Sequence, residues 1–365
     1  MKKAGREVLF LSTNENNARN GEGTFLRLRD GRIMYAYTKF GNNWEDHGMA
    51  DIVALYSSDD GESWGNERII VEHTKEARNA MCPSLVRLKN GEIGLIYARK
   101  IDSTGFCIPH FVKSSDEGET WSCEVVCCED KEQYLVIEND HSIVMSNGRI
   151  LIPANHHPLV LQEDGTKRFV YHAKMVFFAS DDNGETWYTL CDEYDIPFPE
   201  TSATGLQETM VYEKNDGSLR AFSRTDMLCQ YECSSKDDGT TWSTAKPNTY
   251  FTSPASPMLI KRIKDGALAA VFNPIPKYNT RNENTNDAVL PENWGRTPFV
   301  LAISYNDGTS FTKKYFLEDD LTNGYCYPSI FDGGDYMLVG YYHSNGSGVP
   351  LNSNKIVKID YTELD

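Results

Sequence analysis

The sequence predicts an all-β fold, namely a six-bladed β-propeller with four-stranded antiparallel blades. The prediction rests on an octapeptide that recurs along the chain, and on a hairpin pattern that recurs before each copy of it. Hydrophobic residues make up 40% of the chain and charged residues 24%, as expected for a globular protein with a core. No Pro- or Ser-rich linker divides the sequence, so residues 1–365 are expected to form a single domain.

The octapeptide has the pattern Ser-x-Asp-x-Gly-x-Ser/Thr-Trp. It begins at Ser57, Ser114, Ser180 and Ser235, and a degenerate copy ending in Phe begins at Ser304. The Asp can accept hydrogen bonds from the amides of its own turn, and the Gly supplies a positive φ. The terminal aromatic ring can then pack between neighbouring sheets. We expect these Asp-box turns to be structural and to carry no catalytic residues.

A strand, an Asx-Gly or Gly-Gly turn and a second strand precede each box, and the pattern occurs once more after the last box. The six predicted hairpins span residues 24–38, 84–99, 142–156, 209–224, 258–273 and 329–343. The last hairpin lacks a box. Its blade is expected to be completed by Ile356–Tyr361 from one end of the chain and Glu7–Ser12 from the other.

The composition excludes several classes of function. A net charge of −17 and a pI of about 4.9 disfavour nucleic acid and anionic membrane surfaces as partners. No stretch approaches the length of a transmembrane helix. The nine cysteines are scattered without zinc-site spacing, so we expect reduced thiols, no metal, no cofactor and a cytoplasmic protein. A secreted or periplasmic location would apply if a signal peptide had been removed.

Equivalent positions of the inner hairpins should converge on the axis of a propeller. Aligning the hairpins on their turn glycines brings Glu22 and Glu208 to equivalent strand entries, and Arg99 and Arg224 to strand exits. An apolar strand needs no charge there, so these side chains are expected at a shared polar mouth. His156, at another exit, is a candidate for contact with a sugar hydroxyl. The alternative is a solvated network of ion pairs around the rim.

The boxes and the order of the hairpins resemble the sialidase (neuraminidase) superfamily of Asp-box propellers over essentially the whole chain. The resemblance implies that Glu208 is the acidic partner of the nucleophile, and that Arg224 binds substrate one hairpin later. It implies a second substrate-binding arginine at Arg296, before the strand that enters the last box.

The resemblance also implies a tyrosine nucleophile and an aspartate that acts as acid and base. Tyr327 occupies the tyrosine's place, with Tyr325 as the second candidate, and Asp46 matches the aspartate, with Asp51 second. Sialidases are the glycosidases with a Tyr nucleophile. A neutral nucleophile suits a sugar whose anomeric carbon carries a carboxylate, because an anionic one would be repelled.

One departure concerns the first of the three arginines that sialidases use for the substrate carboxylate. This chain has Glu22 in that region; either Arg19 or Arg78 could reach in from a loop, or the third arginine is absent. A carboxylate facing a substrate carboxylate is unfavourable, which leaves open whether the sugar is an ordinary sialic acid. Trp44, on the loop of Asp46, and Trp294, just before Arg296, are candidate pocket walls, although packing under their own loops is an equal alternative.

Together these features predict a retaining exo-glycosidase that removes a terminal acidic sugar, a sialic acid or a related nonulosonic acid, from a carbohydrate or glycoconjugate. A second hypothesis is an exo-arabinanase-like enzyme with a carboxylate pair, formed by Glu22 with Asp46 or Glu208. A third is a non-catalytic carbohydrate-binding propeller.

Overall fold

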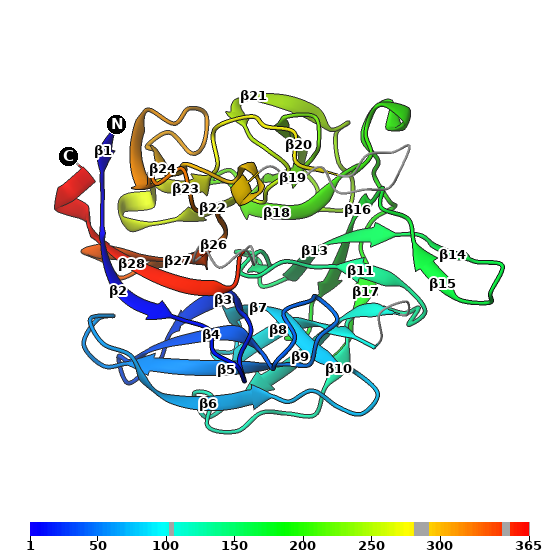
Figure 1. The fold of residues 1–365 in the computed structure, drawn as a ribbon, viewed down its shortest axis with the longest axis horizontal. Helices are drawn as coiled ribbons and strands as arrows, with labels where there is room; N and C mark the ends of the chain where they lie inside the picture. The colour runs from blue at the N-terminus through cyan, green and yellow to red at the C-terminus, as the bar shows by residue number, and fades with distance from the viewer. Residues whose placement is uncertain (102–105, 281–291, 345–350, 365) are drawn as a thin grey trace.

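The computed structural model describes residues 1–101, 106–280, 292–344 and 351–364. Strands dominate this part of the chain, and the prediction of an all-β protein is confirmed (Figure 1). Short 3-10 helices cover Pro199–Thr201, Lys264–Gly266, Glu292–Gly295 and Tyr361–Leu364. Within the described residues, no helix has both the length and the apolar character needed to cross a membrane.

All six predicted hairpins are present as antiparallel strand pairs. The turn glycines have a positive φ, for example +93° at Gly31 and +80° at Gly217, which is why Gly stands there. The pairs are β3 (Asn20–Arg27) with β4 (Ile33–Phe40), β7 (Asn79–Arg87) with β8 (Ile93–Lys100), β12 (Ile143–Val144) with β13 (Ile150–His157), β18 (Gln207–Glu213) with β19 (Leu219–Arg224), β22 (Leu259–Arg262) with β23 (Leu268–Phe272), and β26 (Tyr325–Asp332) with β27 (Tyr336–His343).

Each predicted hairpin and the strands that follow it up to the next hairpin are called a strand group. Each Asp-box joins the third and fourth strands of such a group. In the second box, Asp116 accepts hydrogen bonds from the Ser114 hydroxyl at 2.8 Å and from the Thr120 amide at 2.9 Å. The box-bearing pairs are β5 (Ala50–Ser57) with β6 (Gly65–Val71), β9 (Cys107–Ser114) with β10 (Val125–Val126), β16 (Lys174–Ser180) with β17 (Tyr188–Thr189), β20 (Cys229–Ser235) with β21 (Lys246–Thr252), and β24 (Phe299–Ser304) with β25 (Lys313–Glu318). The boxes are therefore local turns, as predicted.

The two ends of the chain complete the last strand group together. Strand β28 (Ser353–Asp360) pairs with β27, and β2 (Arg6–Leu11) pairs with the other edge of β28 (Figure 1). This confirms that strands from both ends of the chain complete the last group, as predicted. The preceding strand β1 (Lys2–Lys3) pairs in parallel with β25, so the N-terminal segment contacts two neighbouring groups.

Hydrogen bonding does not divide the strands into six separate sheets. The first three groups form one 13-stranded sheet, because Ala50 bridges to Asn79 and Tyr134 bridges to Cys107. The second bridge belongs to β11 (Tyr134–Val136), which also pairs with β13. Strands β14 (Leu159–Leu161) and β15 (Lys167–Phe169) form a separate two-stranded hairpin. The sheets are otherwise five-, four- and four-stranded.

The core lies between neighbouring strand groups, and the boxes help to build it. The ring of Trp187 lies 5.4 Å from that of Phe111 in the preceding group, and Trp242 stacks on Phe177 at 4.5 Å. These two tryptophans thus pack between neighbouring strand groups, and for Trp242 the contact is between sheets, as predicted. Gly184 itself lies so close to Phe111 that a Cβ would be 2.2 Å from the ring.

Asp140 ties several groups together at the centre of the molecule. Its carboxylate accepts hydrogen bonds from the Thr24 hydroxyl at 2.7 Å, the Lys261 ammonium at 2.6 Å and the Ile330 amide at 3.0 Å. These three partners lie on or beside β3, β22 and β26, the first strands of three other groups. The innermost strands are therefore linked across the centre as well as around it.

Candidate functional site

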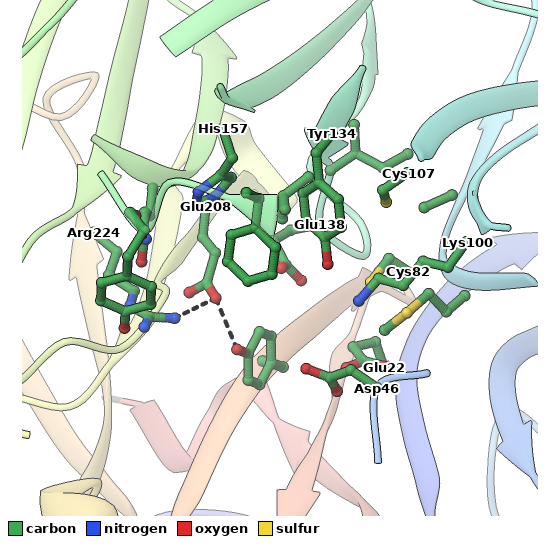
Figure 2. Close-up of a pocket in the computed structure, with 18 of the residues that line it drawn as sticks. Glu22, Asp46, Cys82, Lys100, Cys107, Tyr134, Glu138, His157, Glu208 and Arg224 are labelled. Atoms are coloured by element: carbon green, nitrogen blue, oxygen red, sulfur yellow. Dashed lines mark hydrogen bonds and ion pairs between the residues drawn. The ribbon is translucent and has the colours of Figure 1, made fainter. Parts of the chain in front are cut away.

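A cavity of about 300 Å³ opens where the innermost strands begin. Residues from at least five of the strand groups line it, together with loops between them. Its polar lining is made of Arg19, Glu22, Asp46, Lys100, Glu138, Glu208, Arg224, Arg296 and Tyr327, with further residues including Cys82, Tyr134, His157 and Trp294. In Figure 2, Glu208 and Arg224 lie on one side of this cavity, and Glu22, Asp46 and Lys100 lie on the other.

A repeated β-bulge aims side chains into the cavity. The pairing register shifts at the same place in β3, β7, β18 and β26, and the shifts flank Glu22, Cys82, Glu208 and Tyr327. Cys82, Glu208 and Tyr327 have φ values of 55°, 46° and 53°, a backbone conformation that non-glycine residues rarely adopt. Bulges of this kind re-aim a side chain beside functional sites. The fold thus turns one residue per bulged strand towards the cavity.

Tyr327, Glu208 and Arg224 form a hydrogen-bonded chain. The Tyr327 hydroxyl donates to Glu208 Oε1 at 2.8 Å, and the Arg224 guanidinium contacts the same oxygen. Burial, followed by the charge of Glu208, raises the pKa of Tyr327 well above its ordinary value. The phenol is therefore neutral at physiological pH, with a carboxylate in position to accept its proton.

Arg296 is the second predicted substrate-binding arginine, and it has no carboxylate partner among the described residues. Its guanidinium donates to Cys326 Sγ at 3.1 Å and to the Ala255 carbonyl at 3.2 Å, while its Nε is unpartnered and buried. It lies 5.3 Å from the ring centre of Tyr327 and 5.4 Å from that of Trp294. A buried cation beside the cavity without an anion is suited to bind one.

Arg19 is the third arginine of the cavity. Its Nη2 lies 2.9 Å from Glu22 and its Nη1 lies 2.5 Å from Asp46. Arg78, the other residue considered for this place, lines a different cavity beside His47 and His73. The carboxylate of Glu22 is therefore paired with a cation and does not face the cavity as an isolated charge.

The second candidates for the catalytic groups lie outside the cavity. Tyr325 is fully buried and is not among the lining residues, and Asp51 contacts His73 Nδ1 at 2.7 Å. Tyr327 and Asp46, the first candidates, both line it. Their catalytic roles remain predictions.

Two predicted substrate-binding residues do not line the cavity. Arg99 pairs with Glu124, and His156 pairs with Glu193. Their chain neighbours Lys100 and His157 line it in their place. The reason is the two-residue period of a strand: Arg99 and His156 stand an even number of residues after their turn glycines and point to the other face.

Trp44 also differs from the prediction. Its side chain is exposed and does not line the cavity, although its carbonyl accepts a hydrogen bond from Arg19 at 3.2 Å. Trp294, on the loop before Arg296, is the tryptophan that lines the cavity.

Sequence reasoning missed two buried ionisable residues of the cavity, Lys100 and Glu138. Burial, followed by the charges of Glu208 and Glu22, raises the pKa of Glu138 well above its ordinary value, which favours the uncharged form of this acid. Lys100 has no carboxylate within ion-pair distance among the described residues. An exit position with an odd spacing from the turn glycine would have identified Lys100; no sequence signal marks Glu138.

No group of three or more His, Cys, Asp or Glu side chains in the described residues could hold a metal ion. The nine cysteines, all within the described ranges, are free thiols. The ionisable groups that line the cavity are carboxyl, phenol, ammonium, guanidinium, imidazole and thiol groups.

Comparison with known proteins identifies the family. The model of the BNR repeat-like domain matches residues 28–343, which is most of the chain. The chain belongs to the sialidase/BNR superfamily. A sialidase from Paraclostridium sordellii is 30% identical to this BNR protein over 252 residues, which are 62% of the chain and 55% of the relative. The chain thus spans about half the length of that sialidase.

Solved structures show the same fold for this BNR protein. An intramolecular trans-sialidase from Ruminococcus gnavus, solved in complex with oseltamivir carboxylate, matches 99% of the chain and 98% of its own length, with a TM-score of 0.71 and 14% identity. A protein of unknown function from Dyadobacter fermentans matches 98% of the chain and 99% of its own length, with a TM-score of 0.69 and 18% identity. At such identities the likeness concerns the fold alone.

Proposed function

We propose that this chain is a six-bladed propeller that acts as a retaining exo-glycosidase on a terminal acidic sugar, a sialic acid or related nonulosonic acid. The observation that carries the proposal is the 2.8 Å hydrogen bond from the Tyr327 hydroxyl to Glu208 inside a cavity lined by three arginines. A structural ion-pair network would not require a phenol at a strained bulge, whereas a nucleophile requires both its position and its base. The named function of the P. sordellii relative supports the same reaction class.

In the proposed mechanism, the oxygen of Tyr327 attacks the anomeric carbon while its proton passes to Glu208. Asp46 gives a proton to the departing glycosidic oxygen. A water molecule then releases the sugar from Tyr327, with Asp46 taking a proton from the water and Glu208 returning one to the phenol. The anomeric configuration is inverted twice and so retained.

The arginines hold the substrate carboxylate. Arg296 lacks an anionic partner and would bind the carboxylate most strongly, with Arg224 and Arg19 at its sides. This attraction is local, because the whole chain carries a charge of −17. Binding of an anionic sugar therefore depends on these few buried cations.

Hydrolysis of a fluorogenic sialoside by wild type and by Tyr327→Phe tests the proposal. We expect turnover by wild type and a loss of roughly 10³-fold or more in kcat for the variant, since the nucleophilic oxygen is gone. Tyr325→Phe is the matched control, because this neighbouring phenol is fully buried and lies outside the cavity. It should keep wild-type activity.

The remaining hypotheses make different predictions for the same variants. An enzyme with a carboxylate pair would lose activity on a neutral glycoside with Glu22→Gln and keep it with Tyr327→Phe. A non-catalytic binding propeller would bind acidic sugars without turning over any member of a glycoside panel.

A further inference from the structure

Arg19 holds two carboxylates of very different accessibility. The side chain of Glu22 is 2% exposed, whereas that of Asp46 is 59% exposed and lies at the edge of the cavity. Both ion pairs use the same guanidinium, through Nη2 and Nη1 respectively. One contact of Arg19 is therefore enclosed in the protein, and the other lies where a ligand can reach it.

The enclosed side of Arg19 is held by several contacts. Its Nε donates to the Tyr342 hydroxyl at 2.5 Å, and its guanidinium lies 4.5 Å from the ring centre of Phe40 and 5.2 Å from that of Tyr342. Together with Glu22 these groups fix the plane of the guanidinium. The partner that can leave is Asp46, because its loop is exposed and its carboxylate makes no other hydrogen bond or ion pair with the described residues.

The loop that carries Asp46 is anchored through its backbone. Asn79, fully buried, donates from Nδ2 to the carbonyls of Asp46 at 2.7 Å and Gly48 at 3.3 Å. The side chain of Asp46 can therefore change its partner while its backbone stays beside the cavity.

This arrangement conflicts with the role proposed for Asp46. A general acid must carry a proton, but Asp46 faces Arg19, Lys100 and His47. Desolvation acts to raise the pKa of Asp46, and the charges of Arg19 and Lys100 outweigh it and lower the pKa well below the ordinary value. In the ligand-free protein Asp46 is thus ionised, and it cannot protonate a leaving group.

We propose that Arg19 exchanges partners: it binds the carboxylate of Asp46 in the ligand-free protein, and the carboxylate of the incoming sugar takes its Nη1, so that Asp46 is released to take up a proton. The inference rests on the proposed function and adds a step to it. Binding of the negatively charged substrate thus allows Asp46 to take up the proton that a general acid needs. A neutral glycoside leaves Asp46 paired with Arg19 and ionised. The cavity then discriminates against neutral sugars in the chemical step as well as in binding.

The sign of the linkage follows from the two states of Asp46. The pKa of Asp46 is low while Asp46 is paired with Arg19, and it is higher once the ligand has replaced Asp46 at Arg19. Between these two values, ligand binding draws a proton from solution. Affinity for an anionic sugar therefore falls as pH rises through this window, although the carboxylate of the sugar stays ionised throughout.

Isothermal titration calorimetry tests the exchange with the unreactive glycal of N-acetylneuraminic acid. Titrations at about pH 4 in two buffers of different ionisation enthalpy give the number of protons taken up per ligand, at a pH close to the ordinary Asp pKa of about 3.9. We expect wild type to take up about half a proton per ligand or more, since a carboxyl with an ordinary pKa is about half protonated at this pH. Asp46→Asn should bind the glycal with no proton uptake.

Asp51→Asn is the matched control, since Asp51 lies on the strand that follows the same loop, contacts His73 and does not line the cavity. It should take up the same number of protons as wild type. Binding of the glycal by wild type without proton uptake, or uptake that persists in Asp46→Asn, would overturn the exchange and leave the proposed function intact. Absence of any glycal binding would instead remove the proposed function, and the exchange with it.

Discussion

At the scale of single residues, Lys100 has an unusual environment. Its side chain is 7% exposed, and the ionisable groups packed near it are mostly neutral. Burial raises the pKa of Tyr134 to about 12 and that of Cys107 to about 11. Burial also raises the pKa of Cys82 well above its ordinary value. The ammonium of Lys100 therefore lies in a low-dielectric part of the cavity, and the carboxylate whose charge acts on it is that of Asp46.

Lys100→Met tests what this ammonium does. Met keeps the length of the side chain and removes a desolvated charge, so we expect the free energy of unfolding to stay the same or rise by about 1 kcal/mol. We also expect the KM for an acidic glycoside to rise by about tenfold, because one of the four cations of the cavity is lost. Denaturation curves and steady-state kinetics measure the two effects.

Arg99→Met is the control for Lys100→Met. It removes a neighbouring cation that points to the opposite face of β8 and pairs with Glu124. It should leave the KM unchanged. A Lys100→Met protein that loses stability while keeping its KM would show that Lys100 is a structural residue.

Two routes predicted the candidate site from the sequence: repeated positions of the hairpins, and the family resemblance, which indicated Tyr327, Asp46 and Arg296. Glu22, Glu208 and Arg224 were located by counting from turn glycines, and all three line the cavity. The same counting missed by one residue at Arg99 and His156, because β8 and β13 run farther before leaving the sheet and the side chains alternate. Arg19 could be named only as an alternative, since the contacts that orient it come from Tyr342, at the other end of the chain.

At the scale of the strand and its turns, the Asp-box carries two separate functions in one glycine. Gly184 has a φ of +86°, which disfavours any other residue, and its missing side chain leaves room for Phe111 of the neighbouring group. Gly217, in a hairpin turn, has a similar φ of +80°, but a Cβ there would meet nothing within 4 Å. A comparison of the two glycines therefore separates the energetic effect of the positive φ from that of packing against the neighbouring group.

Gly184→Ala and Gly217→Ala form a matched pair of variants. We expect Gly217→Ala to lower the free energy of unfolding by about 1 kcal/mol, the cost of the positive φ alone. Gly184→Ala should lower it by about 2–4 kcal/mol, because the new methyl group also displaces a buried ring. Chemical denaturation monitored by tryptophan fluorescence compares them. Equal losses would mean that the box glycine serves its turn and not the contact between groups.

The hairpins and boxes could be predicted because their chemistry is local. An Asx-Gly turn or an Asp-box closes within a few residues, so the sequence contains both the donors and the acceptors. The bulges at Cys82, Glu208 and Tyr327 could not be predicted, since their left-handed backbone is held by pairing with the next strand and has no residue preference of its own. For the same reason the sequence indicated which strands border the cavity but not how their side chains are aimed.

At the scale of the whole molecule, the strand groups are joined through the two ends of the chain and across the centre. The chain ends meet in one sheet through β2 and β28. Connection across the centre depends on Asp140, whose carboxylate is bonded to side chains or amides of three other groups. Desolvation, its largest influence, raises the pKa of Asp140 despite the charge of Lys261. The ionised carboxylate is therefore less favourable in the fold than in water, and its contribution to stability falls as pH rises through its folded pKa.

Asp140 then contributes to stability because the groups bonded to it would lack a partner without it. The variant Asp140→Asn measures this contribution to the free energy of unfolding. The variant keeps the shape of the side chain but turns an amide donor towards Lys261 or the Ile330 amide, so we expect a loss of about 2 kcal/mol in the free energy of unfolding. Lys264 and Asp335 form the matched control, with an Nζ to Oδ1 distance of 2.7 Å against 2.6 Å for Lys261 and Asp140. Asp335 is 95% exposed, and Asp335→Asn should change stability by less than about 0.5 kcal/mol. If the two variants were equally stable, the central carboxylate would not contribute to stability, and the pairing of β2 with β28 would remain as the contact that joins the two ends of the chain.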